Sequence, residues 1–544
     1  MFTKRNLLLL IITGFGLLTL GLGSWGLTES SEARYAEISR EMLLSKDYLH
    51  PTLLGIKHYH KPPITYYMTT LGYRIFGINE FGARFFLSVA LLIQLILVYK
   101  IGNLLFRDKK AAAASAIIYV SMPLVLVSTR DLTTDAYLTL FMIWAVFFIL
   151  NYWKKCKIRD LYWFYIMVGI GVLTKGPAML LPIGLFFFAW KIFKKTPIKI
   201  TGHSFLAGSL ALLISSSWFV AVMIEDPKVL QYFINEQIIH RATGAGDMHR
   251  SKPFWYYLLY APLVGFPWFP VIIGMFIKNK FQLSKEHSEI KALSVTALLI
   301  FIAYSSVSSK LIMYVLPMYP FLALTGGYLY VNASEKWLKW IRSGLIIYGA
   351  LLILSILLLN YIPAFNFNMP LSILLAVVFL GAMLVIVKSP KIVKAEQGLL
   401  LSIVTTLGLA LAFTLFASHN PLQIKTFKDI VAFAKSEKEG GIDHFMTYDM
   451  LLPSVAFYLD QEVITIVDNT QKVDRETQFQ HSEAYKNTLI DLTNEKEQLH
   501  LLQLLQNKKY IFLFQVKDSI PPVLKEPVKA LGHSKVFGRY ILYY

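Results

Sequence analysis

Residues 397–417 read QGLLLSIVTTLGLALAFTLFA, a run without a single charged side chain. A transmembrane α-helix needs about 20 consecutive, mostly apolar residues, so this run is long enough to cross a membrane. Similar runs recur along most of the 544 residues, and 55% of the chain is hydrophobic. The sequence therefore predicts a polytopic membrane protein.

The composition excludes several other classes of protein. Only 16% of the residues are charged, whereas a soluble domain carries about 25%. The 38 Phe, 30 Tyr and 10 Trp exclude a disordered polar chain, which lacks aromatic residues. Cys156 is the single cysteine, so an internal disulfide framework and a zinc site built from several cysteines are excluded as well.

About thirteen apolar runs are expected to span the membrane, and the two shortest, 160–173 and 177–193, are the ones expected to merge or tilt. The predicted spans are 6–27, 82–104, 111–128, 136–152, 160–173, 177–193, 204–224, 256–277, 291–308, 313–331, 343–361, 370–387 and 397–417.

Lysine and arginine indicate the orientation of these spans. They gather at the N-terminus and in the short loops after the even-numbered spans, whereas the short turns on the other side hold only Arg130, Lys175 and Lys310. Basic residues mark the cytoplasmic side. The sequence therefore predicts that the loops at about 28–81 and 225–255 lie outside, at the external face of the inner membrane.

The segment from Ser418 onward differs from the rest of the chain. It holds 15 basic and 16 acidic residues, so the net charge of +19 belongs to the preceding part. Strand-like runs at 463–467 and 510–514 alternate with helical stretches at 424–438 and 484–505. We expect a membrane domain over residues 1–417 and a soluble external α/β domain over residues 418–544. No basic stripe lies on the soluble part, which argues against nucleic-acid binding.

The first external loop opens with a group of acidic residues around Glu32. Ser30 or Ser31 can cap a helix there, and carboxylates suit its positive N-terminal end. One interpretation is an amphipathic helix on the membrane surface with solvated carboxylates. The other is that Glu32 acts in catalysis.

The same loop contains Lys61, followed by Pro62 and Pro63. The two prolines restrict the backbone, so the lysine can be held in place to neutralise a phosphate. The alternative is a lysine that reaches the membrane interface to be solvated. The His58-x-His60 pair is a weak metal signal, because two ligands at that spacing are common by chance, and no metal ligand is assigned.

Further ionisable residues are expected on the same side of the membrane. Charges at the ends of spans are functional candidates because they are costly to bury. Asp135 is such a residue in the second external turn, where Arg130 and Asp131 can instead form a structural pair. The basic candidates are Lys175, Arg241 and Lys310. The alternative for each is an ordinary loop residue without a role in function.

Several motifs in order resemble the aminoarabinose transferases of lipid A and the wider GT-C group of glycosyltransferases that use polyprenyl-phosphate sugars, a group that includes the protein O-mannosyltransferases. They cover roughly the first 330 residues. The motifs are Ser31–Met42, His60–Pro63, Leu173–Pro177, Pro253–Tyr257 and Ser309–Leu311.

The resemblance implies a GT-C fold, Asp135 as a second acidic residue of the site, and a donor pocket lined by Lys61 and Tyr314. One position departs from the family, which has Asp-Glu where this chain has Ser31-Glu32. The family gives the central role to the leading aspartate. In this chain, that role can belong to Glu32 or to Glu29, which lies about one turn earlier. Alternatively, Ser31 indicates a different acceptor.

We therefore expect a membrane glycosyltransferase that moves a hexose or pentose from a polyprenyl-phosphate donor to a lipid A-like glycolipid or a protein. Glu32 or Asp135 would orient or deprotonate the acceptor. The donor-binding residues would be Lys61, Lys175, Arg241, Lys310 and Tyr314. A divalent cation could assist. The alternative functions are a transporter or flippase for a lipid-linked anion, and a scaffold protein whose tail recruits partners.

Overall fold

The computed structural model describes residues 14–29, 31–194, 201–235, 251–278, 288–437, 441–468, 473–480, 482–506 and 509–544. It divides into two compact units. Unit 1 comprises Met1–Leu22 and Arg84–Phe416, and unit 2 comprises Gly23–Ala83 and Ala417–Tyr544. Unit 2 thus holds the predicted external tail together with the whole of the first external loop predicted at about 28–81. The division into residues 1–417 and 418–544 as separate domains stays a prediction.

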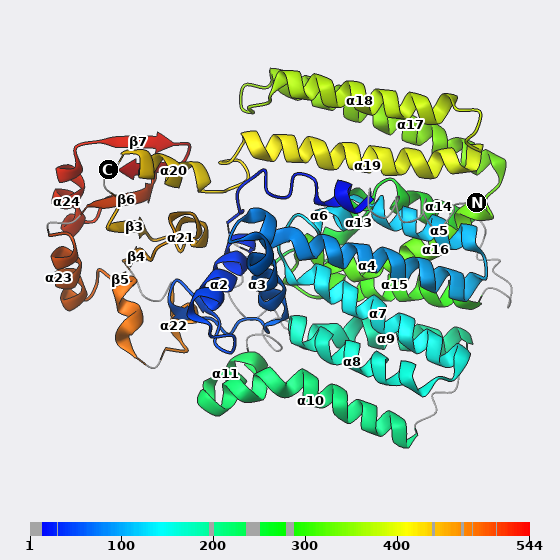
Figure 1. Ribbon diagram of the computed structural model, residues 1–544, viewed down its shortest axis with the longest axis horizontal. Coiled ribbons are helices and arrows are strands. Elements are labelled where there is room, and N and C mark those ends of the chain that lie inside the picture. The colour runs from blue at the N-terminus through cyan, green and yellow to red at the C-terminus, as the bar shows by residue number, and fades with distance from the viewer. Residues whose placement is uncertain are drawn as a thin grey trace. The chain divides into compact units, whose positions relative to one another are not determined.

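Unit 1 is helical (Figure 1). Its helices are α4 (Glu80–Phe106), α5 (Lys109–Val120), α6 (Pro123–Val127), α7 (Thr134–Lys155), α8 (Ile158–Lys175), η1 (Gly176–Met179), α9 (Leu180–Lys194), α10 (Gly202–Glu225), α11 (Lys228–Tyr232), α13 (Tyr256–Val264), α14 (Trp268–Lys278), α15 (Ser288–Ser306), η4 (Ile312–Met318), α16 (Tyr319–Val331), α17 (Glu335–Leu358), η5 (Leu359–Tyr361), α18 (Met369–Lys388) and α19 (Lys394–His419).

Within the described residues, nine helices are long and apolar enough to cross a membrane, or ten if the bent pair α13 and α14 counts as one span. A mostly helical, multi-pass fold is confirmed, whereas the count of about thirteen is not. The runs at 160–173 and 177–193 join into one stretch, Ile158–Lys194. The run at 111–128 breaks before Pro123 into α5 and α6, because proline cannot donate a helical hydrogen bond. The start of the span at 6–27 lies outside the described residues.

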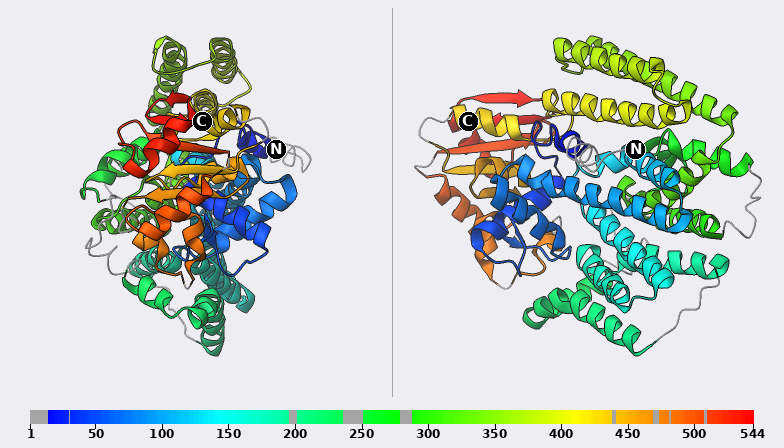
Figure 2. Two further views of the ribbon diagram at one scale, coloured as in Figure 1. Left: turned by 90° about the vertical axis from the view of Figure 1, so that its left-hand side faces the viewer. Right: turned by 45° about the vertical axis from the view of Figure 1, so that its right-hand side comes forward.

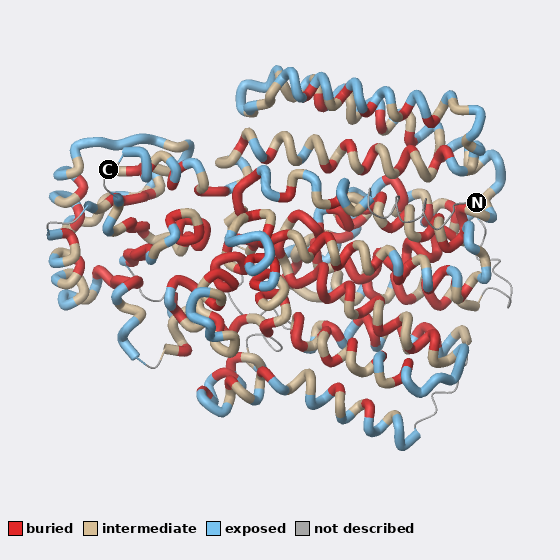
Figure 3. The backbone as a smooth tube through the Cα atoms, in the orientation of Figure 1, coloured by how far each residue is buried: buried red, intermediate tan, exposed pale blue. Residues whose placement is uncertain are grey.

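Burial is unequal among these helices (Figure 3). The apolar window of α10 is only 22% buried and that of α18 only 28%, whereas that of η4 and α16 is 83% buried. Leu212 and Leu213 on α10 are each 68% exposed. Exposed leucines on this scale suit contact with lipid rather than water. The protein is therefore a multi-pass membrane protein.

Polar groups of three helices meet at the break between α5 and α6. The Ser121 carbonyl accepts a hydrogen bond from Thr406 Oγ1 at 2.8 Å. The Ser121 hydroxyl accepts from Trp268 Nε1 at 2.7 Å and from Ser402 Oγ at 3.1 Å. A broken membrane helix is tolerated where neighbouring helices satisfy the freed backbone groups. These contacts make the break a stable feature of the bundle.

Unit 2 combines an α/β sheet domain with the segment that follows the first span. Its elements are α2 (Glu32–Ser45), β1 (Thr52–Leu53), β2 (Ile56–Lys57), α3 (Ile64–Phe76), α20 (Lys428–Glu437), β3 (His444–Tyr448), α21 (Pro453–Leu459), β4 (Val463–Val467), α22 (Asp474–Thr477), η7 (Glu483–Asn487), β5 (Leu489–Asp491), α23 (Glu495–Leu504), β6 (Tyr510–Gln515), η8 (Pro522–Leu524), α24 (Lys525–Leu531), β7 (Ser534–Phe537) and β8 (Tyr540–Tyr543).

The six-stranded sheet of unit 2 (Figure 2) has the strand order β5-β4-β3-β6-β8-β7; the pairs β6–β8 and β8–β7 are antiparallel, and the other pairs are parallel. The predicted α/β domain and its strands at 463–467 and 510–514 are confirmed. The single helix expected over 484–505 is wrong, because residues 489–491 form β5 instead. Pairing with β4 gives those residues ladder hydrogen bonds that a helix prediction from local sequence cannot foresee.

The segment Gly23–Ala83 packs on the C-terminal part of unit 2. Glu29 N donates to Lys425 O at 2.8 Å, and Leu27 N donates to Tyr458 Oη at 2.6 Å. Thr488 Oγ1 donates to Leu54 O at 3.1 Å. The first external loop is therefore an ordered part of unit 2, built from two helices and a short β-hairpin.

Candidate active site

Three predicted site residues meet in unit 1. The ammonium group of Lys175 donates to Asp135 Oδ1 in an ion pair whose side chains are 9% and 5% exposed. Lys175 Nζ also lies 4.1 Å from the centre of the Tyr314 ring, close enough for a cation–π contact. The structure thus brings together one predicted catalytic carboxylate and two predicted donor-binding residues.

Helix ends explain why these side chains meet. Asp135 lies in the first turn of α7, and Lys175 is the last residue of α8, which packs along α7 (Figure 1). Gly176 ends α8 with a φ of +66°, a backbone angle that favours glycine. Tyr314 enters from η4, which contacts α7. Charges at such positions are functional candidates.

One tyrosine beside this cluster was missed by the sequence analysis. Tyr304, near the end of α15, has its ring centre 6.4 Å from that of Tyr314. Local spacing does not mark this residue, because the contact depends on the packing of α15 against η4. Tyr257, in the aromatic motif that was noted, donates through its hydroxyl to Leu311 O at 2.7 Å and so holds the chain just before η4.

Lys310 is buried and has a different environment from Lys175. Its ammonium group donates to Lys252 O at 3.0 Å and to the carbonyl of Val307. Burial lowers the pKa of this lysine. These carbonyl contacts tie two segments of unit 1 together, so the geometry gives Lys310 a positioning role. Its predicted contact with the donor stays a prediction.

Arg130 is also buried in unit 1. Its guanidinium donates to Thr129 Oγ1 at 3.1 Å and to Leu20 O at 3.4 Å. Burial and the charge of Arg84 lower the pKa of Arg130 to about 10. Arg241 lies outside the described residues.

Glu32, the other predicted catalytic carboxylate, belongs to unit 2. It is buried in the first turn of α2, and its Oε2 accepts from Thr28 N at 2.9 Å and from Thr28 Oγ1 at 3.1 Å. These bonds close the turn that enters the helix. The carboxylate therefore supports the local fold, whatever else it does.

Glu29, the possible substitute for Glu32, has a structural contact of its own. Its Oε1 accepts from Ser454 N at 3.0 Å and from the Ser454 hydroxyl. Ser454 lies in the first turn of α21, where a carboxylate complements the positive end of the helix. This contact favours a structural role for Glu29.

Lys61 also belongs to unit 2. Its side chain is partly exposed, and the buried Pro62 and Pro63 follow it and lead into α3. Pro63 takes the N-cap position of that helix. The predicted restraint of the backbone next to Lys61 is therefore present, whereas its contact with a donor stays a prediction.

A buried ion pair on α2 was not predicted from the sequence. Glu37, 1% exposed, accepts from Arg40 at 2.8 Å, and Arg40 also donates to Asp460 Oδ1 at 2.9 Å. Burial raises the pKa of Glu37, while Arg40 opposes the shift. The helical spacing of Glu37 and Arg40 was visible in the sequence, but Asp460 is distant along the chain and gave no signal.

Glu41 follows one turn later and binds the β1–β2 hairpin. Its Oε1 accepts from Leu54 N at 2.6 Å, and its Oε2 accepts from Gly55 N at 3.3 Å. Burial, with a smaller contribution from the charge of Glu37, raises the pKa of Glu41 to about 7. The group therefore titrates in the physiological range.

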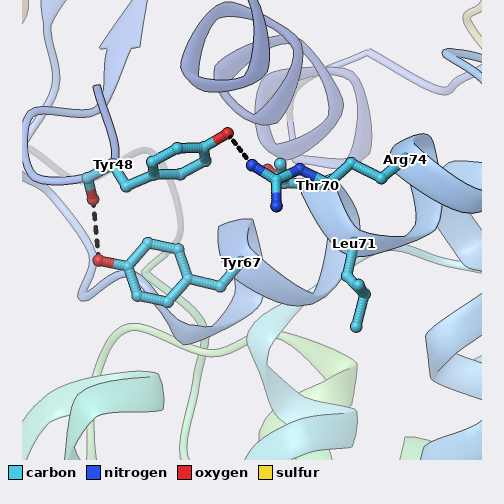
Figure 4. Close-up of a pocket in the computed structure, with 5 residues that line it drawn as sticks. All are labelled: Tyr48, Tyr67, Thr70, Leu71 and Arg74. Carbon is cyan, nitrogen blue, oxygen red and sulfur yellow. Dashed lines mark hydrogen bonds between the residues drawn. The ribbon is translucent and has the colours of Figure 1, made fainter. Parts of the chain in front are cut away.

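Unit 2 also contains a hollow of about 370 Å³ lined by Tyr48, Tyr67, Thr70, Leu71 and Arg74 (Figure 4). Arg74 Nη2 donates to Tyr48 Oη at 2.5 Å, and Tyr67 Oη donates to Tyr48 O at 2.8 Å. One guanidinium and two phenols can hold an anionic or sugar group. The motif analysis did not single out these residues.

The chain is similar to known proteins over much of its length. The family "Dolichyl-phosphate-mannose-protein mannosyltransferase" matches residues 60–220. An undecaprenyl phosphate-α-4-amino-4-deoxy-L-arabinose arabinosyl transferase of Pseudomonas paraeruginosa is 30% identical over 61% of this chain and 61% of its own length. A second such transferase, from Proteus mirabilis, is 28% identical over 64% of each chain.

Solved structures extend the likeness to the fold. ArnT from Cupriavidus metallidurans, solved with undecaprenyl phosphate bound, has a TM-score of 0.76 with 19% identity and covers 99% of this chain and 98% of its own. Its apo form has a TM-score of 0.75. The resemblance inferred from the motifs is therefore confirmed: the chain is similar in sequence to GT-C glycosyltransferases that use polyprenyl-phosphate sugars, and it has their fold.

Proposed function

We propose that the protein is a membrane glycosyltransferase that moves a pentose of the aminoarabinose type from a polyprenyl-phosphate donor to a lipid A-like acceptor. One observation carries the proposal most strongly: the Asp135–Lys175 ion pair, whose lysine lies over the Tyr314 ring, at the ends of apolar helices. The names of the relatives, which specify undecaprenyl phosphate and an aminoarabinose sugar, support the choice of donor and sugar. A protein acceptor is the second candidate.

The pair suggests how binding can prepare the reaction. A donor phosphate competes with the Asp135 carboxylate for the Lys175 ammonium group, so donor binding frees the carboxylate to accept a hydrogen bond from the acceptor. Tyr314 supplies an aromatic face to the same cation. The charge on the phosphate is then stabilised by a lysine that is already in place.

The transfer step follows from this arrangement. The acceptor oxygen forms a bond to the anomeric carbon while the bond from that carbon to the donor phosphate oxygen breaks. The electron pair leaves with polyprenyl phosphate, and a proton on the acceptor passes to the carboxylate, here Asp135. Lys61 is proposed to bind the donor phosphate as well, and Glu32 to orient the acceptor.

The proposed location of the site favours a lipid-linked donor. Nucleotide sugars are made in the cytoplasm, whereas we propose that the site and unit 2 face outward from the inner membrane. The two ends of unit 1 differ as this orientation requires. Asp135 begins α7 and Lys175 ends α8, whereas α7 ends in Lys154 and Lys155, and α9 ends in Lys194.

The orientation is testable with cysteine labelling in intact cells. Cys156 is exposed and lies just after the basic end of α7, and Lys517 is an exposed residue of unit 2. A membrane-impermeant thiol reagent should label Lys517→Cys and should label Cys156 only after permeabilisation. Labelling in the reverse pattern would contradict the outward placement.

The activity is testable with purified protein and lipid mass spectrometry. Transfer should occur from a polyprenyl-phosphate sugar and fail with nucleotide sugars alone. Envelope lipids from cells with the chain should carry a covalently added sugar that is missing from cells without it. A transporter or flippase would move the lipid across the membrane and form no new glycosidic bond, so the product separates the two functions.

A further inference from the structure

Two histidines and a glutamate meet in unit 2, apart from the residues proposed for transfer. Their ligand atoms, one from each of His58, His60 and Glu476, all lie within 4.8 Å of one another. His58 Nδ1 is 3.3 Å and His60 Nε2 is 3.4 Å from Glu476 Oε2. The two imidazoles are buried, at 2% and 3% exposure.

The local backbone explains this convergence. His58 and His60 follow the strand β2 with one residue between them, and alternate residues of an extended chain point to the same side. Their rings are stacked, with centres 4.1 Å apart. Glu476 lies on α22, which packs against β2, and Gln480 Nε2 donates to Lys57 O at 3.4 Å. The two segments are thus held together by contacts outside the cluster.

The distances fit a tetrahedral metal ion. Zinc binds histidine nitrogen and carboxylate oxygen at about 2.0–2.2 Å. Two ligands of a tetrahedral ion with such bonds are about 3.3–3.4 Å apart. Both histidine–glutamate distances in the cluster match that separation.

The donor set selects the kind of metal. Imidazole nitrogen suits zinc and neighbouring transition metals, whereas calcium and magnesium prefer ligand sets made of oxygen. Two imidazoles and one carboxylate are a typical three-residue zinc set, which leaves one position for water or a further side chain. The planes of the two rings are only 15° apart, so one ring must turn to aim both nitrogens at a shared ion.

We propose that His58, His60 and Glu476 bind a divalent transition-metal ion, with Zn²⁺ preferred. The ion joins the β1–β2 hairpin to the α22 segment and stabilises unit 2. It also fixes the backbone beside Lys61, which follows His60. The effect of this restraint on donor binding is the only part that rests on the proposed function. Without metal, the same residues form a cluster of histidine–carboxylate ion pairs, which is the competing explanation.

The test uses the purified full chain in detergent and needs no activity assay. Protein stripped with EDTA should take up about one Zn²⁺ per chain by mass spectrometry of the metal, and its unfolding temperature should rise. Mg²⁺ should have neither effect. His58→Asn, His60→Asn and Glu476→Gln should each weaken Zn²⁺ binding by on the order of 100-fold and remove the rise.

Two control variants carry the same chemical changes elsewhere. His203→Asn removes an exposed histidine of α10, and Glu483→Gln removes an exposed carboxylate of η7. Both should bind Zn²⁺ as the unaltered chain does. Failure of the unaltered chain to bind Zn²⁺, or equal binding by the three cluster variants, would overturn the proposal. Either result leaves the transferase proposal standing, because neither measures sugar transfer.

Discussion

The acidic residues in and just before α2 and the acidic residue of α7 have different surroundings. In unit 2, Glu29, Glu32 and Glu41 each accept hydrogen bonds from the backbone of a turn, hairpin or helix start. In unit 1, the structure gives Asp135 an ion pair with Lys175, whose ammonium group lies over the ring of Tyr314. A cluster of carboxylates in a motif is therefore partly explained by folding, whereas a single buried ion pair at a helix end is the better indication of chemistry.

Replacing Asp135 tests the chemical side of this comparison and should have the largest effect. Asp135→Asn keeps the shape and one oxygen for Lys175 but loses the charge and the basicity. We expect kcat to fall about 1,000-fold, within the range for a lost general base. Turnover with a polyprenyl-phosphate sugar measures the effect, and the control is that the purified variant remains folded and monodisperse, because loss of one partner of the ion pair also lowers the unfolding temperature. Activity within a few-fold of the unaltered chain would exclude Asp135 as the base.

Replacing Glu37 tests the structural side. Glu37→Gln leaves the buried Arg40 with Asp460 alone, and loss of one partner of a buried ion pair costs about 3–5 kcal/mol. We expect the low end, about 3 kcal/mol, because Asp460 remains. Denaturant or thermal unfolding of the purified chain measures it. If Glu37→Gln left stability intact and abolished turnover, the assignment of structural roles to the acidic residues of unit 2 would be wrong.

Lys61 lies in unit 2 but is predicted to bind the donor. Lys61→Ala should lower kcat/KM by about 100-fold, because a charge opposite the donor phosphate is lost. Lys61→Arg should keep part of the activity, since the charge remains while the geometry changes. Initial rates over a range of donor concentrations separate the two variants. Equal rates for Lys61→Ala and the unaltered chain would remove Lys61 from the donor site.

Glu41 provides a pH test of unit 2. Its folded-state pKa of about 7 lies above the ordinary value of 4.5, so the folded state holds a proton that the unfolded state releases. Stability should therefore be greatest at low pH and fall as the pH rises from about 4.5 to 7, with a slope of at most about 1.4 kcal/mol per pH unit. Unfolding temperatures across this range measure the slope. Glu41→Gln should flatten it, and an unchanged slope would assign it to another group.

The smallest effect is expected at the hollow around Arg74. The side chain is exposed, so Arg74→Ala should weaken binding of an anionic acceptor only a few-fold. Initial rates over a range of acceptor concentrations measure this change in KM, with kcat unaltered. Leu71→Ala in the same lining is a matched control that removes no charge. Equal changes in both variants would mean that charge has no part in the effect.

Sequence alone determined the class of the protein, since apolar runs longer than about 20 residues have few uses outside a membrane. It also made Asp135, Lys175 and Tyr314 candidate site residues, through a resemblance and through the placement of charges at span ends. Only the tertiary structure decided that Lys175 pairs with Asp135 and stands over Tyr314, because these residues are separated along the chain. It also decided the number of long spans, since proline breaks and bends depend on contacts with neighbouring helices. The His58–His60–Glu476 cluster was also visible only in the tertiary structure. Hydrophobic periodicity and local spacing reveal neighbours within one helix or strand, whereas Glu476 is more than 400 residues from the histidines and meets them only because the elements pack together.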